Sequence, residues 1–220
     1  MVLQDTLSTF IAATAPAHDD VQTEMAAEAE DRDFPIIGRV AGAYLQHVAA
    51  ARSAEAVFEF GSGFGYSASW FLKGMSHTGD IVLTDLEEEN LEQAAAYLGR
   101  SHVTEHIHFE AGDALEIIDG YVGPFDIVLL DHDKSAYDEG FETVESKMKP
   151  GGVIIADNIL RGPVAYEDIH SFVVEGEGIP EDDANAAGLV RYLRTMHAHP
   201  DYHTFVLPIG NGLAVSTRME

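Results

Sequence analysis

One short stretch, LLDHDKSAY at 129–137, gathers ionisable side chains directly after an apolar run. It contains Asp131, His132, Asp133 and Lys134, residue types that bind ligands and transfer protons in active sites. Lys134 stands out because the chain has 38 acidic residues but only 12 lysines and arginines. The same residues could instead form a solvated acidic loop, so their place in the fold must decide between the two interpretations.

Polar residues also follow other short apolar runs of the chain. In chain order they are the glycine-rich segment GSGFG at 61–65, Asp85, Gly112 with Asp113, and Asp157 with Asn158. Ligands of open parallel sheets bind beyond the carboxyl ends of the strands, so we expect all these residues to meet at one edge of one sheet. Local alternatives remain open: Asp85 and Asp113 could cap the helices after them, and Asp157–Asn158 could form an ordinary turn.

The elements that would position these residues alternate in type from residue 56 onward. Apolar runs predict strands at 56–60, 80–84, 106–110, 125–130 and 152–156, and the segments between them predict helices at 65–74, 87–99, 114–119 and 135–148. This order is typical of a parallel sheet with right-handed crossovers. Near the C-terminus, YHTFVLPIGNGLAVSTR predicts two strands joined by a turn in which Gly210, Asn211 and Gly212 supply positive φ. We therefore predict an α/β fold, Rossmann-like and doubly wound, with a mostly parallel seven-stranded sheet and an antiparallel C-terminal strand.

Residues 1–55 precede the sheet and are predicted to be helical. The segment at 3–15 has apolar residues at helical spacing, and a more polar helix follows it. A third helix is expected to open with Pro35, because proline suits the first position of a helix. Residues 173–188, VVEGEGIPEDDANAAG, are predicted to form an acidic loop. Neither a repeat nor a second domain is indicated, so we expect one domain over 1–220.

The composition excludes several classes of function. A formal net charge of −26 repels nucleic acids and anionic membranes, so we expect neither as a partner. This charge around a core of ordinary apolar content suggests a halophilic protein, and we expect folding to need molar salt because salt screens the self-repulsion. The chain has no cysteine and no apolar run near the ~18 residues that span a bilayer. We therefore expect a cytoplasmic protein without disulfides or thiolate zinc sites.

The glycine-rich segment narrows the choice of ligand. A dinucleotide fold requires G-x-G-x-x-G, with the pyrophosphate at a helix N-terminus, but here Tyr66 stands where the third glycine should be. Asp85 follows at about the spacing (~20 residues) of a carboxylate that binds a ribose diol. The best match is a nucleoside ligand without a phosphate chain, of which S-adenosylmethionine is the obvious candidate. An NAD-linked dehydrogenase stays as an alternative, disfavoured by Tyr66 and by the C-terminal hairpin.

Six segments together resemble a known family. They are VFEFGSGFGYSASW, DIVLTDLEEENLEQA, FEAGDALEII, PFDIVLLDHDKSAY, GGVIIADNIL and VLPIGNGLAVSTR. Their order is similar to that of the metal-dependent class I O-methyltransferases, which include the catechol and caffeoyl-CoA types. The resemblance covers roughly residues 34–160 and 203–218. Its most specific part is D-x-x-K after the fourth strand combined with D-N after the fifth.

The resemblance implies a role for each of the following residues. Gly61, Gly63 and Ser67 would lie along the methionine part of S-adenosylmethionine, Glu59 would support that loop, Asp85 would bind the ribose hydroxyls, and Asp113 and Ala114 would lie near the adenine. Asp131, Asp157 and Asn158 would hold a divalent cation, and this set of hard oxygen ligands suits Mg²⁺. Asp131 would also border the cofactor and take part in catalysis, with Lys134 as the general base.

These features predict a methyl transfer to oxygen. The expected enzyme is an S-adenosylmethionine-dependent, divalent-metal-assisted O-methyltransferase that acts on a catechol-like or phenolic small molecule. The resemblance also implies a homodimer and an acceptor pocket covered by residues 1–55. Two further alternatives stay open: a metal-independent S-adenosylmethionine methyltransferase that acts on nitrogen or on another small metabolite, and a non-catalytic binding protein. For Lys134, the structural alternative is an ion pair with Asp131 or Asp138 at the start of a helix.

Overall fold

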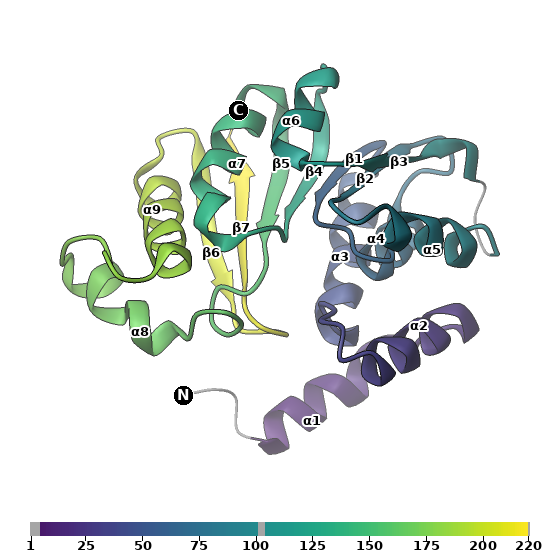
Figure 1. Cartoon of the computed structure of the whole chain (residues 1–220), viewed down its shortest axis with the longest axis horizontal. Coiled ribbons are helices and arrows are strands. Elements are labelled where there is room, and N and C mark those ends of the chain that lie inside the picture. Colours follow the sequence, from purple (N-terminus) through teal and green to yellow (C-terminus); the bar gives the residue numbers. More distant parts are fainter. Residues whose placement is uncertain (1–4, 101–103, 220) are drawn as a thin grey trace.

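The computed structural model describes residues 5–100 and 104–219. Its centre is a seven-stranded sheet with the strand order β3-β2-β1-β4-β5-β7-β6 (Figure 1). The strands are β1 (Ala56–Phe60), β2 (Asp80–Asp85), β3 (Ile107–Ala111), β4 (Phe125–Leu130), β5 (Met148–Ala156), β6 (Tyr202–Leu207) and β7 (Leu213–Arg218). β1 to β5 are parallel, and β7 runs antiparallel to β5 and β6. The predicted mostly parallel sheet with an antiparallel strand from the C-terminal hairpin is confirmed.

Helices cover both faces of this sheet. One core contains residues of α2 (Asp20–Asp31), α3 (Arg39–Arg52), α4 (Tyr66–Gly74) and α5 (Glu88–Leu98), and the other contains residues of α6 (Ala114–Ile117), α7 (Tyr137–Val144), α8 (Tyr166–His170) and α9 (Ala184–Ala198). Ile127 and Leu129 of β4 join the first core, whereas Val128 and Leu130 join the second. Successive side chains of a strand point to opposite faces, so one apolar run supplies both cores. The doubly wound arrangement is thereby confirmed.

The three N-terminal helices precede the sheet in the chain, and α2 and α3 contribute residues to the first core. α1 (Asp5–Thr14) lies next to α2 at the lower edge of the view in Figure 1, and the predicted helical residues 3 and 4 are outside the described part. The expectation that Pro35 opens a helix is wrong. α3 begins at Arg39, because Gly38 with a φ of 79° takes the capping position. Residues 34–38 are thus free to form a connection that lines the site described below.

Two boundaries near the fifth strand also differ from expectation. The predicted helix at 135–148 is shorter, since α7 spans Tyr137–Val144, and β5 begins at Met148 instead of residue 152.

The predicted acidic loop at 173–188 is also shorter than expected. A π-helical turn occupies Ser171–Glu175, and α9 begins at Ala184 because the Asp183 carboxylate accepts a hydrogen bond from Ala186 N at 3.0 Å. In the turn before β7, Gly210 and Gly212 have positive φ but Asn211 does not.

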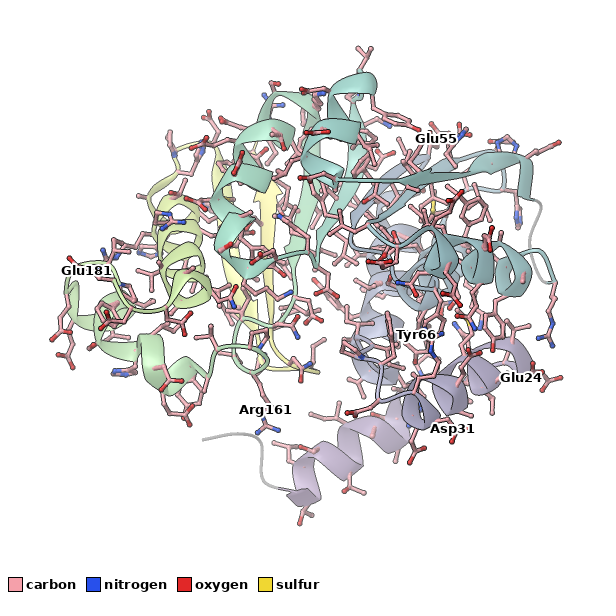
Figure 2. All side chains as sticks on the ribbon, viewed as in Figure 1. Glu24, Asp31, Glu55, Tyr66, Arg161 and Glu181 are labelled. Carbon is pink, nitrogen blue, oxygen red and sulfur yellow. The ribbon has the colours of Figure 1, made fainter. Side chains whose placement is uncertain are left out.

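Acidic side chains occupy the outer surface, as the composition predicts. Glu24, Asp31, Glu55 and Glu181 are exposed at the periphery of the molecule, whereas Tyr66 lies buried near its middle (Figure 2). Across residues 5–100 and 104–219, the helices are too short or too polar for any of them to span a bilayer.

Candidate active site

A cavity of about 960 Å³ lies at the carboxyl ends of the five parallel strands. Its wall contains nearly all residues that the sequence predicted for the site: Gly61, Gly63, Ser67, Asp85, Asp113, Ala114, Asp131, Lys134, Asp157 and Asn158. Backbone hydrogen bonds hold Asp131 and Asp157 against the ends of neighbouring strands. Asp131 N donates to Phe60 O of β1 at 3.0 Å, and Asp157 N donates to Leu130 O of β4 at 3.1 Å. Glu59 is the exception and is buried in β1, outside the cavity wall.

The glycine loop is shaped by close contact with its neighbours. Gly61 has a φ of 79°, and a Cβ at this position would lie 2.6 Å from the carbonyl oxygen of Asp131. Gly63, with a φ of 51°, donates from its backbone N to Asp85 Oδ2 at 2.9 Å. A side chain at Gly61 would push the loop away from the end of β4, and one at Gly63 would collide with the ring of Phe34, 2.9 Å from the added Cβ. The loop therefore presents bare backbone to the cavity.

The two aspartates after β2 and β3 have different partners. Asp85 Oδ1 accepts hydrogen bonds from Glu87 N at 2.9 Å and from the Asn90 side chain at 3.0 Å. Together with the bond from Gly63, these contacts tie the glycine loop to the start of α5. Asp113 is the N-cap of α6 and accepts from Leu115 N at 2.9 Å. The capping interpretation therefore holds for Asp113, whereas Asp85 does more than start a helix.

Glu59 is a buried carboxylic acid beneath the glycine loop. Its side chain is fully buried, and neither carboxylate oxygen has a well-aligned hydrogen-bond partner among the described residues. Burial raises the pKa of Glu59 to about 8, although the nearby hydroxyls of Ser67 and Ser62 oppose this shift. At neutral pH the ligand-free protein therefore holds Glu59 largely protonated.

Lys134 at the cavity wall donates two hydrogen bonds and lies over an aromatic ring. Its Nζ lies 2.8 Å from Asp131 Oδ1, 3.0 Å from the His132 carbonyl oxygen and 4.8 Å from the centre of the Tyr137 ring. Only 7% of the side chain is exposed. Of the two ion-pair partners considered for this lysine, Asp131 is the one present, because Asp138 binds Arg191 instead.

Asp157 is the second carboxylate of this corner. Burial, with the charge of Asp131 as the next cause, raises the pKa of Asp157 to about 7. Burial likewise raises the pKa of Asp131, against the opposing effect of Lys134. The Oδ1 atom of Asp157 is buried and has no partner within the described part of the chain. Of the two buried carboxylates, only Asp131 is ion-paired with Lys134, so one lysine faces two acidic groups in this corner.

A divalent cation fits this corner. Asn158 follows Asp157 in the left-handed conformation, with a φ of 59°, and its side chain makes no hydrogen bond to another described residue. The unpartnered Oδ1 of Asp157 and the deficit of positive charge are what a hard cation would relieve. Residues 5–100 and 104–219 contain no group of three His, Cys, Asp or Glu that could hold a metal. A site here would therefore depend on the amide of Asn158 as well as on the two carboxylates.

The cavity wall also contains His132, one of the ionisable residues that the sequence singled out, and two asparagines that the sequence did not place at the site. His132 packs between the rings of Phe60 and Tyr137, each with ring centres 5.1 Å away. Burial lowers the pKa of His132 to about 4, so this histidine is a neutral packing residue. Asn185 of α9 and Asn211 of the β6–β7 turn also line the cavity. Neither was placed at the site from the sequence, because α9 was not predicted and Asn211 was considered only as a turn residue.

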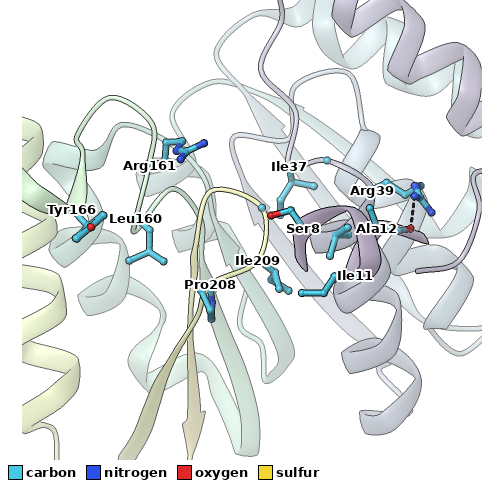
Figure 3. A pocket seen from close by; sticks show the side chains of 13 residues that line it. Ser8, Ile11, Ala12, Ile37, Arg39, Leu160, Arg161, Tyr166, Pro208 and Ile209 are labelled. Atoms are coloured by element: carbon cyan, nitrogen blue, oxygen red, sulfur yellow. Dashed lines mark hydrogen bonds between the residues drawn. The ribbon is translucent and has the colours of Figure 1, made fainter. Parts of the chain in front are cut away.

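A second, smaller cavity of about 510 Å³ adjoins the first. Both are lined by Ile37, and the loop after β5 and the β6–β7 turn contribute to both walls. Figure 3 shows how α1, the connection to α3, the loop after β5 and the β6–β7 turn surround it. Arg39 holds α1 in place by donating to the carbonyl oxygens of Ala12, Ala15 and Pro16, where the helix end leaves acceptors unpaired.

Comparison with known proteins adds sequence evidence. The model of a family described as O-methyltransferase matches residues 21–219. A catechol O-methyltransferase of Niastella koreensis is 29% identical over 140 residues, which cover 61% of this chain and 63% of that protein. A catechol O-methyltransferase of Mycobacterium tuberculosis is 27% identical over 194 residues, or 87% of this chain and 83% of that protein. In fold, the O-methyltransferase TomG of Streptomyces achromogenes, solved in complex with SAM, superposes with a TM-score of 0.83 over 100% of both chains at 21% identity.

Proposed function

Since this chain belongs to the O-methyltransferase family, we propose that it transfers a methyl group from S-adenosylmethionine to an oxygen of a catechol-like or phenolic small molecule, with a divalent cation, Mg²⁺ by preference, as an aid. The family membership makes the chain a methyltransferase. Cofactor, metal and acceptor are the parts that the proposal adds.

The corner formed by Lys134, Asp131 and Asp157 is the observation on which the proposal depends. It combines a buried lysine, two carboxylates with raised pKa and one buried oxygen without a partner. An enzyme that only held its two substrates side by side would not need this group of buried charges, because an uncompensated buried charge destabilises the fold. A cation and an ionising acceptor oxygen would compensate it.

The reaction is an in-line displacement, in which the bond from methyl to sulfur breaks as the bond to oxygen forms. Asp85 and the glycine loop would hold the nucleoside, which fixes the methyl group relative to the corner. When bound by Asp131, Asp157 and Asn158, a divalent cation would lower the pKa of a phenol from its usual ~10. Lys134 Nζ, in its neutral amine form, would accept the phenolic proton and afterwards release it to solvent. Asp131, at 2.8 Å, would keep this nitrogen oriented.

Metal removal tests the proposal most directly. Treatment with a chelator should abolish methylation of a catechol acceptor, while calorimetry should show nearly unchanged affinity for S-adenosylmethionine. Added Mg²⁺ should restore the rate. Asp157→Ala should behave like the chelator, because a hard-ion site with few protein ligands does not tolerate the loss of a carboxylate.

The control for this experiment is Asp113→Ala, which removes a carboxylate from the same cavity wall but only an N-cap of α6. It should leave the metal dependence intact. Turnover that survives chelation would reject the role of the metal and would favour the metal-independent S-adenosylmethionine methyltransferase.

A further inference from the structure

One arginine at the smaller cavity has a side chain without a partner among the described residues. Arg161 belongs to the loop after β5 and lines this cavity (Figure 3). Its backbone N donates to Asn211 O at 2.9 Å, so the position of the residue is fixed against the β6–β7 turn. Its side chain is exposed and makes no hydrogen bond or ion pair with any other described residue. The backbone of Arg161 is therefore held in place, while its guanidinium is available to bind a ligand.

This freedom is unusual in a chain with so few cations. Within the described residues, every lysine and arginine except Arg52 and Arg161 makes a side-chain hydrogen bond or an ion pair. Arg52 packs beside Gly151 and lines neither cavity. Arg39 does line the smaller cavity, but its guanidinium serves the carbonyl oxygens at the end of α1. Arg161 is thus the free cation in the described wall.

The remaining wall of the smaller cavity is mostly apolar. It includes Ile11, Ile37, Leu160, Pro208 and Ile209, which suit the flat apolar body of an aromatic ring. A protein of net charge −26 repels anions from most of its surface. A guanidinium binds a carboxylate through two parallel hydrogen bonds, and this short-range contact persists when salt screens the distant acidic residues.

We propose that the methyl acceptor is an aromatic acid, a phenol that carries a carboxylate, and that Arg161 binds this carboxylate while the ring lies in the smaller cavity. The inference rests on the proposed function, because it takes the reacting oxygen to lie at the Lys134 corner of the larger cavity. The two cavities adjoin through Ile37 and the loop after β5. The proposed acceptor would span both cavities, with its carboxylate in the smaller one and its phenol oxygen in the larger one.

A binding experiment tests the anion site without any methyl transfer. Cinnamate has the ring and the carboxylate but no phenol, and methyl cinnamate has the same body without the charge. With S-adenosylhomocysteine present, calorimetry should show tighter binding of cinnamate than of its ester. Arg161→Gln should weaken cinnamate binding about 10- to 100-fold and leave the ester unchanged. Arg161→Lys should lose less, because it keeps the charge but not the planar fork.

Arg52→Gln is the matched control, since it removes the other unpartnered arginine and should change neither ligand. The inference is overturned if the native protein binds the two ligands equally or binds neither. It is also overturned if Arg161→Gln weakens both by the same factor, because that result would mean a general disturbance of the cavity wall.

Turnover separates this inference from the proposed function. With caffeate and methyl caffeate as acceptors, Arg161→Gln should raise KM about 10- to 100-fold for the acid alone and leave kcat nearly unchanged. If cinnamate binds as expected but neither caffeate nor its ester is methylated, the anion site stands and phenol methylation fails. If both are methylated with the same KM in the native protein, phenol methylation stands and the role of Arg161 fails.

Discussion

The two cavities of this protein are built in different ways. The larger one is formed by loops that directly follow β1 to β5, and its residues are linked through the backbone, as in the bonds from Asp131 N to Phe60 O and from Asp157 N to Leu130 O. The smaller one is enclosed by four segments that are far apart in the sequence. There the contacts depend on side chains such as Arg39. The backbone therefore fixes the geometry of the larger cavity, where we propose that the cofactor binds. The smaller cavity, where we propose that the acceptor ring lies, can vary with its side chains.

This difference has a physical cause. Parallel pairing places consecutive strand ends at one edge of the sheet whatever the side chains are. A chamber closed by a helix and three loops depends on which side chains happen to pack between them. We therefore expect substitutions at the larger cavity to impair chemistry or cofactor binding, and substitutions at the smaller one to change acceptor affinity alone. Three of the four variants below test this contrast, and Glu59→Gln tests the buried acid beneath the glycine loop.

Lys134→Met should have the largest effect. Loss of a positioned base should lower turnover ~10²–10⁴-fold, with cofactor affinity nearly unchanged, and the defect should shrink at high pH, where the phenol ionises without help. Lys73→Met is a matched control, because Lys73 also pairs with an aspartate and lies over an aromatic ring, Trp70. Single-turnover kinetics and calorimetry would measure both variants. A defect of similar size in the two variants would contradict the assignment of the base.

Glu59→Gln should change the pH dependence of stability. The pKa of Glu59 is raised to about 8 in the folded protein, so between pH 4.5 and 8 the folded state binds more protons than the unfolded state and stability falls as pH rises. Glutamine cannot ionise, so the unfolding free energy of the ligand-free variant should match that of the native protein near pH 4.5 and exceed it by up to about 5 kcal/mol well above pH 8.

Thermal or denaturant unfolding at several pH values would measure this difference. Glu92→Gln changes an exposed glutamate and should show no such trend. A constant difference between Glu59→Gln and the native protein at all pH values would contradict the protonated state of Glu59.

Asp85→Ala should weaken S-adenosylhomocysteine binding by about 1.5–3 kcal/mol, the value of hydrogen bonds to a charged group. The loss has two sources, since the carboxylate would no longer bind the ribose and would no longer hold Gly63 N. Calorimetry provides the measurement. Asp113→Ala, which removes only a helix cap, should cost less, and equal losses in the two variants would show that both act through local folding.

Arg39→Met should have the smallest effect, and this effect should be limited to the KM for the acceptor. Without the three bonds to the end of α1, this helix should open more often, which hydrogen exchange of its amides would detect. We expect KM for the acceptor to rise up to about tenfold, because one wall of the smaller cavity is loosened. Arg194→Met, which frees carbonyl oxygens of Phe172 and Glu177 outside both cavities, should leave KM unchanged. A change in cofactor affinity would contradict the separation of the two ends.

Much of the larger cavity could be predicted from the sequence. The apolar runs and the polar residues after them gave the sheet, and β1 and β4 have the predicted bounds. The family assignment followed from motifs that stand on the strand ends. These predictions succeed because each depends on residues close together in the chain and on the fixed direction of parallel strands. The helix expected from Pro35 failed, since a local preference for a first helical position does not show whether a helix follows.

Other features were decided by tertiary structure alone. Asp85 and Asp113 look alike in the sequence, yet only Asp85 meets the glycine loop. Arg52 and Arg161 are both exposed and have no side-chain partner in the described part of the chain, yet of the two only Arg161 lines one of the two cavities. The smaller cavity and the raised pKa of Glu59 have no local signature either. The sequence determines the order of strands and the polar residues at their ends, because hydrophobic period and turn chemistry are local. The hydrogen-bond partners, burial and electrostatic environment of a side chain arise only when distant segments pack together. The smaller cavity could therefore be found only in the tertiary structure.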